Sequence, residues 1–188
     1  MLFEDEQLHW FAIQVRANHE RIANAVLEQK GFCTFLPVYR ARSLWSDRIK
    51  IVERPVFPGY FFCLLHPQKR QPVVTVHSIV RIVGVGNTPT PVDAGELAAV
   101  HAIVSSDLPC APQRYLQAGE PVKIVAGPLR GLEGILQRQR GVHRVIVSVN
   151  LIRQSVAVEI DDSSVMPLIA GPRSEPSLTV GSRAQAIQ

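Results

Sequence analysis

The chain has 188 residues, 46% of them hydrophobic, which is enough for one core of about 100 residues and a smaller second one. It carries 20 Lys and Arg against 16 Asp and Glu, and the formal net charge of +4 permits a polyanionic partner without establishing one. Cys33, Cys63 and Cys110 show no CxxC spacing, so we expect free thiols in a reducing compartment and no metal site. The acidic N-terminus and the lack of a long apolar run predict a cytoplasmic protein with no membrane partner.

The first strand and the first helix are predicted near the N-terminus. Residues 10–15 (WFAIQV) are short, apolar and rich in β-forming residues. In 18–31 (NHERIANAVLEQKG), Asn18 can accept amide protons at a helix start, and Gly31 permits the left-handed backbone that ends a helix. One face of this helix carries apolar residues at helical spacing, namely Ile22, Ala23, Val26 and Leu27.

Further strands and a second helix complete the first half of the chain. Apolar stretches at 32–39 (FCTFLPVY), 54–62 (RPVFPGYFF) and 73–86 (VVTVHSIVRIVGVG) predict strands. Asp93, with Glu96 three residues later, is an acidic variant of the capping box that begins a helix. This order of elements indicates an α+β domain with helices on an antiparallel sheet.

The second half of the chain has a different pattern. Residues 105–118 (SSDLPCAPQRYLQA) contain two prolines and no periodicity, which predicts a linker. Five short alternating segments follow and predict a small β-barrel: PVKIV, LEGILQRQ, RVIVSVNLI, VAVEI and VMPL. The last residues are polar and rich in Pro, Gly and Ser, which predicts a disordered tail. The expected organisation is a domain at 8–105, a linker at 106–118, a second domain at 119–169 and the tail at 170–188.

Two motifs in a fixed order carry a resemblance to a known family. The first is WFAIQVRANHE with FLPVY and RPVFPGYFF, and the second is GEPVKIVAGPLRGLEGIL followed by VSVNLIRQSVAVEI. Over residues 8–168 the chain resembles the NusG-like transcription elongation and antitermination factors, which join an N-terminal NGN domain to a C-terminal KOW domain. The resemblance implies an NGN-like α+β fold followed by a five-stranded SH3-like barrel. It also implies a monomer without catalytic residues or cofactors that modulates transcriptional pausing and termination.

Members of this family bind the clamp helices of the largest RNA polymerase subunit. The resemblance implies that a hydrophobic depression receives these helices and is lined by Trp10, Phe57, Tyr60, Phe62 and Ile82. Alternation along the strand places Tyr60 and Phe62 on one face and Phe61 on the other, where an ordinary core position is expected. For Trp10, Phe57, Tyr60 and Phe62 the alternative to polymerase binding is an ordinary position in the sheet core.

A basic segment lies between the second and third predicted strands. Five basic residues between Arg40 and Arg54 face two acidic ones, a local charge of +3, and Trp45 lies at the expected tip of a hairpin. Clustered charge attracts phosphates, and tryptophan can stack on an unpaired base. The alternative is a solvated loop in which Trp45 packs locally. Specialised family members touch non-template DNA with the region around the first helix, where this chain has Arg16, Arg21 and Lys30. The candidate contacts to non-template DNA or nascent RNA are therefore Arg16, Arg21, Lys30, Arg42, Trp45 and Arg48.

The barrel suggests a second partner. General NusG proteins use the loop between the third and fourth barrel strands, with an aromatic residue, to contact a ribosomal protein or the termination factor Rho. This chain has Leu151, Ile152 and Arg153 there, and 71–74 (QPVV) lacks the His-Thr-Thr type of loop, so we favour a specialised, operon-restricted paralogue. Two alternatives stay open: a ribosomal or translation-linked RNA-binding KOW protein, favoured by the basic barrel residues, and a module that bridges transcription to another machine. The barrel's basic residues are Arg130, Arg138, Arg140, Arg144 and Arg153.

Overall fold

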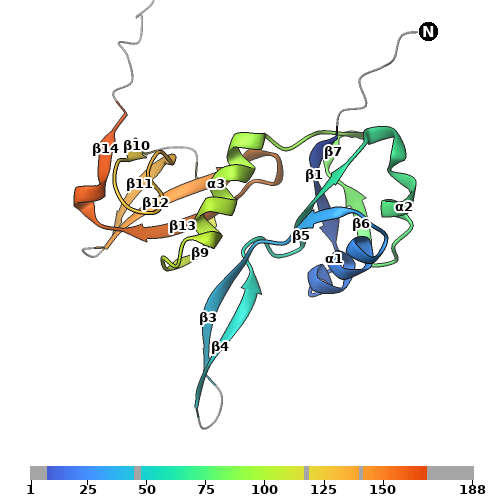
Figure 1. Ribbon diagram of the computed structural model, residues 1–188, viewed down its shortest axis with the longest axis horizontal. Coiled ribbons are helices and arrows are strands. Elements are labelled where there is room, and N and C mark those ends of the chain that lie inside the picture. The colour runs from blue at the N-terminus through green and yellow to red at the C-terminus, as the bar shows by residue number, and fades with distance from the viewer. Residues whose placement is uncertain (1–7, 45–47, 117–118, 140–141, 169–188) are drawn as a thin grey trace, which may run out of the picture.

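The computed structural model describes residues 8–44, 48–116, 119–139 and 142–168 (Figure 1). Trp45 and the tail predicted at 170–188 therefore lie outside the described residues. No helix within the described ranges is long and apolar enough to cross a membrane. Figure 1 shows two lobes with a helix between them and a two-stranded ribbon that extends away from both.

The first lobe is built on a four-stranded antiparallel sheet in the order β2-β5-β1-β6. Its strands are β1 (His9–Val15), β2 (Cys33–Phe35), β5 (Tyr60–Leu65) and β6 (Ile79–Ile82). Helix α1 (Glu20–Gln29) follows β1, as the sequence predicts. Gly31, which follows the residue that caps the helix C-terminus, Lys30, has the expected positive φ of 86°.

The sheet buries both of its faces. On one face, Phe11, Ile13 and Phe61 form a core with Ala23 and Leu27 of α1. The opposite face contributes Ala12 and Phe62 to a second core, which contains residues of α3 (Ala94–Ser105). Phe61 is thus a core residue on the face opposite to Phe62, which confirms the alternation predicted for this strand.

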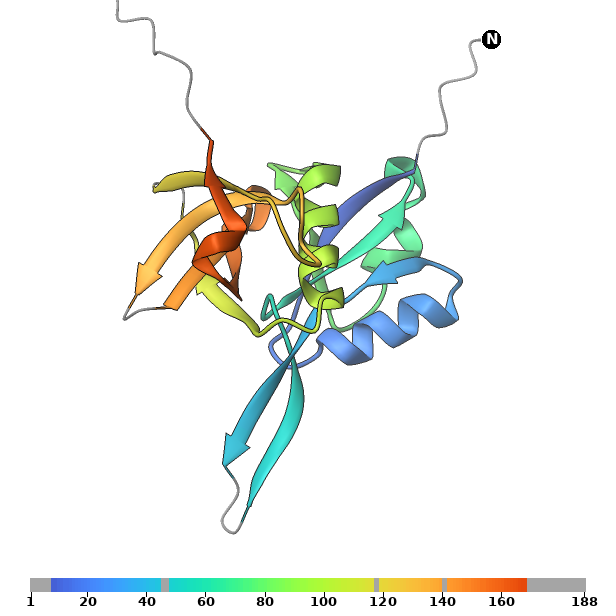
Figure 2. The same ribbon diagram turned by 60° about the vertical axis from the view of Figure 1, so that its left-hand side comes forward.

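Helix α3 lies between the two lobes (Figures 1 and 2). Asp93 Oδ1 accepts a hydrogen bond from the Glu96 backbone N–H at 2.9 Å, which confirms the predicted start of this helix. Its sequence, AGELAAVHAIVS, is apolar on nearly every side, as expected for a helix that is covered on more than one face. Leu97, Val100 and Ile103 are buried in the core that the two lobes share.

Two predictions from local sequence in the first lobe are wrong. Asn18 does not cap α1: it has a φ of 62°, and the residue at the cap position is His19, without a side-chain cap. The apolar segment predicted as strands from Val73 begins with a short helix, α2 (Gln71–Val74), because Pro72 is compatible with a first helical turn. After β6 the chain forms a small hairpin of β7 (Gly84–Val85) and β8 (Thr88–Pro89).

The basic segment forms the ribbon. Strands β3 (Val38–Leu44) and β4 (Ile49–Pro55) pair along their whole length, and the views in Figures 1 and 2 show the pair extending away from the rest of the molecule. The strand predicted at 32–39 is divided at Pro37, whose carbonyl accepts the Val56 N–H at 2.9 Å and closes the base of the ribbon.

The second lobe is a six-stranded antiparallel sheet in the order β14-β10-β11-β12-β13-β9. The five predicted strands are present as β10 (Glu120–Ile124), β11 (Glu133–Gln139), β12 (Val142–Val149), β13 (Gln154–Ile160) and β14 (Val165–Pro167). The sixth, β9 (Cys110–Arg114), comes from the segment predicted as linker and pairs with β13. Because β9 is an edge strand, it tolerates Pro112, which has no N–H to donate. The described pairings do not show the closed barrel that the sequence predicts.

The three cysteines are free thiols, as predicted. Cys63 is fully buried in β5, and burial, with Cys33 as the smaller cause, raises the pKa of the Cys63 thiol from 9.0 to about 12. Since the pKa is higher in the folded state, we expect stability to be constant below about pH 9 and to fall as the pH rises towards 12. Denaturant unfolding at several pH values measures this loss. The Cys63→Ala variant should show a smaller loss, and an identical loss in both proteins would contradict the prediction.

Candidate functional site

The aromatic residues around the FPGY turn converge on one face of the first sheet. The β1–β5 register pairs Trp10 with Leu64 and Ala12 with Phe62, so these side chains share a face. The Phe57 ring lies edge-on to the Phe62 ring, with 5.9 Å between centroids. On its other side, Phe62 stacks on Phe35 of β2 at 6.0 Å. The structure thus brings together four of the five predicted polymerase-binding residues, with Tyr60 at the start of β5.

A buried glutamate holds the turn that precedes Tyr60. Gly59 has a φ of 83°, which favours glycine, and its backbone N–H donates to Glu20 Oε1 at 2.7 Å. The Gly59 carbonyl accepts the Val15 N–H at 2.9 Å, so β1 and α1 both fix this turn. The sequence indicates an acid in the first turn of α1, but gives no sign that Glu20 reaches Gly59. Glu20 is therefore a positioning residue that the sequence analysis missed.

The cluster is less accessible than an open receptor surface. Phe57 and Phe62 are fully buried, and Trp10 and Tyr60 are half-buried. A depression that receives a helix requires accessible rings, and for Phe57 and Phe62 the structure corrects this expectation, because the shared core covers both rings.

Ile82 does not belong to this cluster. The β1–β6 register pairs it with Ile13, which lies on the α1 side of the sheet, and Ile82 packs against that core. The five residues named for one polymerase-binding surface therefore lie on two opposite faces. The error arises because only the register between β1 and β6 decides which face Ile82 occupies.

The second lobe docks against α3 and the FPGY turn. The Glu96 carboxylate accepts the Asn150 backbone N–H at 3.1 Å and also a hydrogen bond from the Asn150 side-chain amide. The Gln154 amide lies 3.5 Å from the Pro58 carbonyl oxygen. One hydrophobic cluster combines Phe57 and Phe62 with β-strand residues of the second lobe. The two lobes therefore share a core.

The loop predicted to bind a second partner lies at this junction. Ile152 is buried, Leu151 packs against the shared core, and Arg153 is exposed. Arg153 has a left-handed φ of 51°, and its guanidinium carbon lies 4.8 Å from the centre of the Tyr115 ring. Asn150, directly before this loop, is the residue that binds Glu96. The loop at 151–153 and the aromatic cluster thus border the same core.

The candidate nucleic-acid contacts are spread over the first lobe. Arg16 donates to His77 Nε2 at 3.0 Å, Arg21 forms an ion pair with Glu53 at 3.2 Å, and Lys30 donates to the Pro72 carbonyl at 2.9 Å. Arg42 and Arg48 are exposed on the ribbon and near its end. The structure thus places Arg21 beside the ribbon through Glu53, whereas Arg16 and Lys30 contact the segment around α2.

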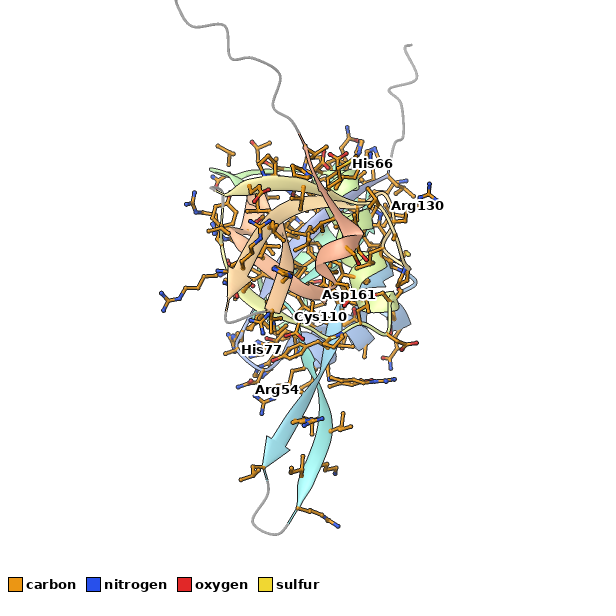
Figure 3. The ribbon with its side chains drawn as sticks, turned by 90° about the vertical axis from the view of Figure 1, so that its left-hand side faces the viewer. Arg54, His66, His77, Cys110, Arg130 and Asp161 are labelled. Carbon is orange, nitrogen blue, oxygen red and sulfur yellow. The ribbon has the colours of Figure 1, made fainter. Side chains whose placement is uncertain are left out.

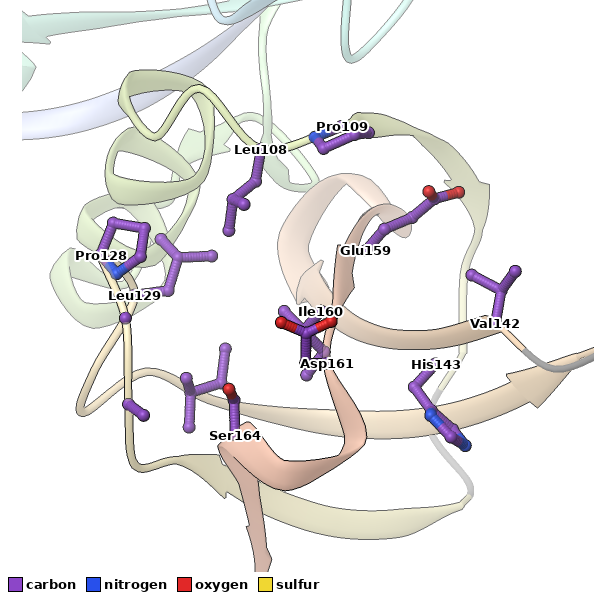
Figure 4. Close-up of a pocket in the computed structure, with 13 residues that line it drawn as sticks. Leu108, Pro109, Pro128, Leu129, Val142, His143, Glu159, Ile160, Asp161 and Ser164 are labelled. Atoms are coloured by element: carbon purple, nitrogen blue, oxygen red, sulfur yellow. The ribbon is translucent and has the colours of Figure 1, made fainter.

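Two clefts lie in or beside the second lobe. Figure 4 shows one of about 610 Å³, with Pro128 and Leu129 on one side and Val142 and His143 on the other. The other, of about 780 Å³, lies between α3 and the second sheet and includes Glu96 and Asn150. Residues 151–153 line neither cleft. Within the described residues, no group of three or more His, Cys, Asp or Glu side chains is placed to hold a metal ion.

These features define a two-lobed α+β protein with an aromatic cluster beside the FPGY turn and a basic ribbon that extends from the first lobe. Residues 8–101 match the family model described as "Transcription termination factor nusG", so the chain belongs to the NusG family of transcription factors.

Relatives of known identity agree with this assignment. The chain is 24% identical over 161 residues to the transcription termination/antitermination protein NusG of Bacillus subtilis, a match that covers 81% of this chain and 89% of that protein. It is 22% identical over 127 residues to the Helicobacter pylori protein of the same name, covering 66% of this chain and 72% of that protein. A solved structure titled "Domain interaction in Thermotoga maritima NusG" matches 85% of this chain and 96% of its own, with a TM-score of 0.54 and 19% identity, which shows the fold.

Proposed function

We propose that the protein is a non-enzymatic, cytoplasmic elongation or antitermination factor that binds the clamp helices of RNA polymerase and modulates pausing and termination. The aromatic cluster of Trp10, Phe57, Tyr60 and Phe62 is the polymerase-binding surface. The loop at 151–153 recruits a second partner, of which a ribosomal protein and Rho are the candidates. We also expect contacts to non-template DNA or nascent RNA from the basic residues of the first lobe.

The convergence of the aromatic cluster carries this proposal. Aromatic side chains bury a large apolar area at little entropic cost, and the apolar face of an amphipathic helix fits such a surface. Membership of the NusG family supports transcription as the process. The register that places Trp10 and Phe62 on one face supports a single contact surface.

Domain movement is a requirement of the proposal. Because Phe57 and Phe62 are fully buried, a partner helix reaches their rings only after the covering residues shift. The second lobe shares their cluster and touches the turn at Pro58 through Gln154. Tyr60, which is half-buried, is accessible to a partner first.

Tyr60→Ala tests the surface with little disturbance of the core. We expect this variant to bind a purified clamp-helix fragment about tenfold more weakly or worse, and Tyr60→Phe to bind like the wild type, because the ring supplies the contact. Binding is measured by titration in solution, with circular dichroism to show that each variant is folded. Val80→Ala, at an exposed position of β6, is the control. If Tyr60→Ala binds as well as the wild type, the surface is elsewhere.

The RNA-binding alternative gains little from the structure. Arg138 pairs with Glu120 at 2.9 Å, and Arg144 pairs with Glu159 at 2.7 Å. These contacts offset part of the positive charge on which that hypothesis depends. Tight, salt-sensitive binding of ribosomal RNA by the full chain, without binding to the clamp-helix fragment, would favour it over our proposal.

A further inference from the structure

The ribbon formed by β3 and β4 presents apolar side chains to solvent. Each strand has seven residues, which span about 20 Å at roughly 3.3 Å per residue, and both views of the molecule show the pair extending away from its lobes. An isolated two-stranded ribbon is marginally stable in water. Leu44, Ile49 and Ile51 on this ribbon are exposed, so they do not pack into a hydrophobic core.

Register sorts the ribbon side chains into two faces. Because directly opposed residues share a face, the pairs Arg42–Ile51 and Leu44–Ile49 lie on the same side. Leu44 is 86% exposed, Ile51 65% and Ile49 62%, so they form a continuous exposed patch. We call this side the aliphatic face, and its residues are Val38, Arg40, Arg42, Leu44, Ile49, Ile51, Glu53 and Pro55. The other face carries Tyr39, Ala41, Ser43, Lys50, Val52 and Arg54.

Positive charge adjoins the aliphatic patch. Arg40 and Arg42 are exposed on the same face, and Figure 3 shows Arg54, which belongs to the other face, near the base of the ribbon. The acid on this face, Glu53, pairs with Arg21 of α1 at 3.2 Å, so its charge is offset locally. The charges complement a polyanion.

The half of the aliphatic face nearest the lobes is partly enclosed. Arg40, Arg42, Ile51 and Glu53 line a cleft of about 450 Å³ with Val104 and residues 106–110, which include the exposed Asp107. Leu44 and Ile49 are not part of its lining. A large partner therefore meets the outer half of the face, around Leu44 and Ile49, with the largely exposed Ile51 at the edge of the cleft.

We propose that the aliphatic face of the ribbon lies in the major groove of duplex DNA. The major groove of B-DNA is about 12 Å wide and admits a two-stranded β-ribbon. It also exposes the thymine methyl group, an apolar contact for the patch of Leu44, Ile49 and Ile51. Arg42, which is exposed beside the patch, contacts a phosphate that borders the groove, where each neutralised phosphate releases counterions.

Duplex RNA is a poor match for the same surface. The major groove of an A-form helix is deep and narrow, and its wide minor groove displays 2′-hydroxyl groups. RNA also lacks the thymine methyl group, so three exposed aliphatic side chains find no apolar partner there. Binding to single strands depends chiefly on aromatic stacking, whereas the described part of this face is aliphatic.

This inference rests on the proposed function and narrows it: for the ribbon it names duplex DNA in place of a single non-template strand or nascent RNA, and its test is separate. The full-length protein is titrated with an AT-rich DNA duplex of about three helical turns, without polymerase. The comparison probes are the same duplex with uracil in place of thymine, the matching RNA duplex and one DNA strand alone. If the protein does not bind the DNA duplex, the clamp-helix result is unaffected. If it does not bind the clamp-helix fragment, the DNA result is likewise unaffected.

We expect the thymine duplex to bind more tightly than the RNA duplex and the single strand. Replacing thymine by uracil should weaken binding about fourfold for each methyl group that the face contacts. This factor corresponds to the free energy gained when one methyl group leaves water for an apolar contact. Ile51→Ala should reduce this difference, because only Leu44 and Ile49 are left to contact methyl groups, whereas Val52→Ala, the matched truncation on the other face, should preserve it. Arg42→Gln should reduce the slope of log affinity against log salt concentration by about 0.9.

Ile51 is largely exposed, so its truncation is expected to leave the fold intact, and circular dichroism checks this. The proposal is overturned if the wild type does not bind the duplex, if RNA or single-stranded DNA binds equally well, or if uracil substitution has no effect. Equal sensitivity to the methyl group in Ile51→Ala and the wild type also overturns it.

Discussion

Phe57→Ala is expected to lower the free energy of unfolding by about 3–5 kcal/mol, the range measured for buried phenylalanines. The Phe57 side chain is fully buried, and its ring packs edge-on against Phe62 at 5.9 Å. Removing it leaves a cavity in the core that both lobes share. Denaturant unfolding followed by tryptophan fluorescence measures the loss.

The matched control is Tyr60→Ala, because Tyr60 is half-buried and its removal should cost less. A loss of less than about 1 kcal/mol in Phe57→Ala would contradict the burial of this ring and favour an open aromatic surface. The expected result has a practical consequence for the polymerase hypothesis. Weak binding by Phe57→Ala reports on the binding surface only if the variant is shown to be folded.

Glu96→Ala is expected to weaken docking of the second lobe by about 10- to 100-fold. This range follows because hydrogen bonds to a charged group contribute roughly 1.5–3 kcal/mol, which the variant loses. The Glu96 carboxylate accepts both Asn150 bonds across the junction. The start of α3 should be unaffected, because its cap uses the Glu96 backbone N–H and the Asp93 side chain. Hydrogen exchange of the loop at 150–152 measures the change.

Glu133→Ala is the control for the loss of one acidic side chain, because Glu133 pairs with Lys123 inside the second sheet. We expect this control to leave exchange at 150–152 unchanged. If docking restricts access to the aromatic cluster, Glu96→Ala should also bind the clamp-helix fragment more tightly, since a larger fraction of molecules is competent to bind. Unchanged exchange in Glu96→Ala would show that the shared apolar core alone holds the lobes together.

The sequence by itself determined the elements whose signals are local. Asp93 and Gly31 act on the helix ends beside them, alternation assigned Phe61 and Phe62 to opposite faces, and the strands of the second lobe follow from short alternating segments. For the ribbon the sequence indicated only a hairpin in the basic segment, and the extent of its two strands came from the structure. These features depend on residues a few positions apart, which periodicity and turn chemistry capture.

Only the tertiary structure decided the features that join distant segments. Register with β1 placed Ile82 on the face opposite to Trp10, and pairing with β13 turned a predicted linker into β9. Glu20 reaches Gly59, and Glu96 reaches Asn150, across 39 and 54 residues of chain. The burial of Phe57 and Phe62 likewise depends on a core to which both lobes contribute. No local pattern encodes these contacts, because each depends on which distant backbone and side-chain groups the complete fold brings together.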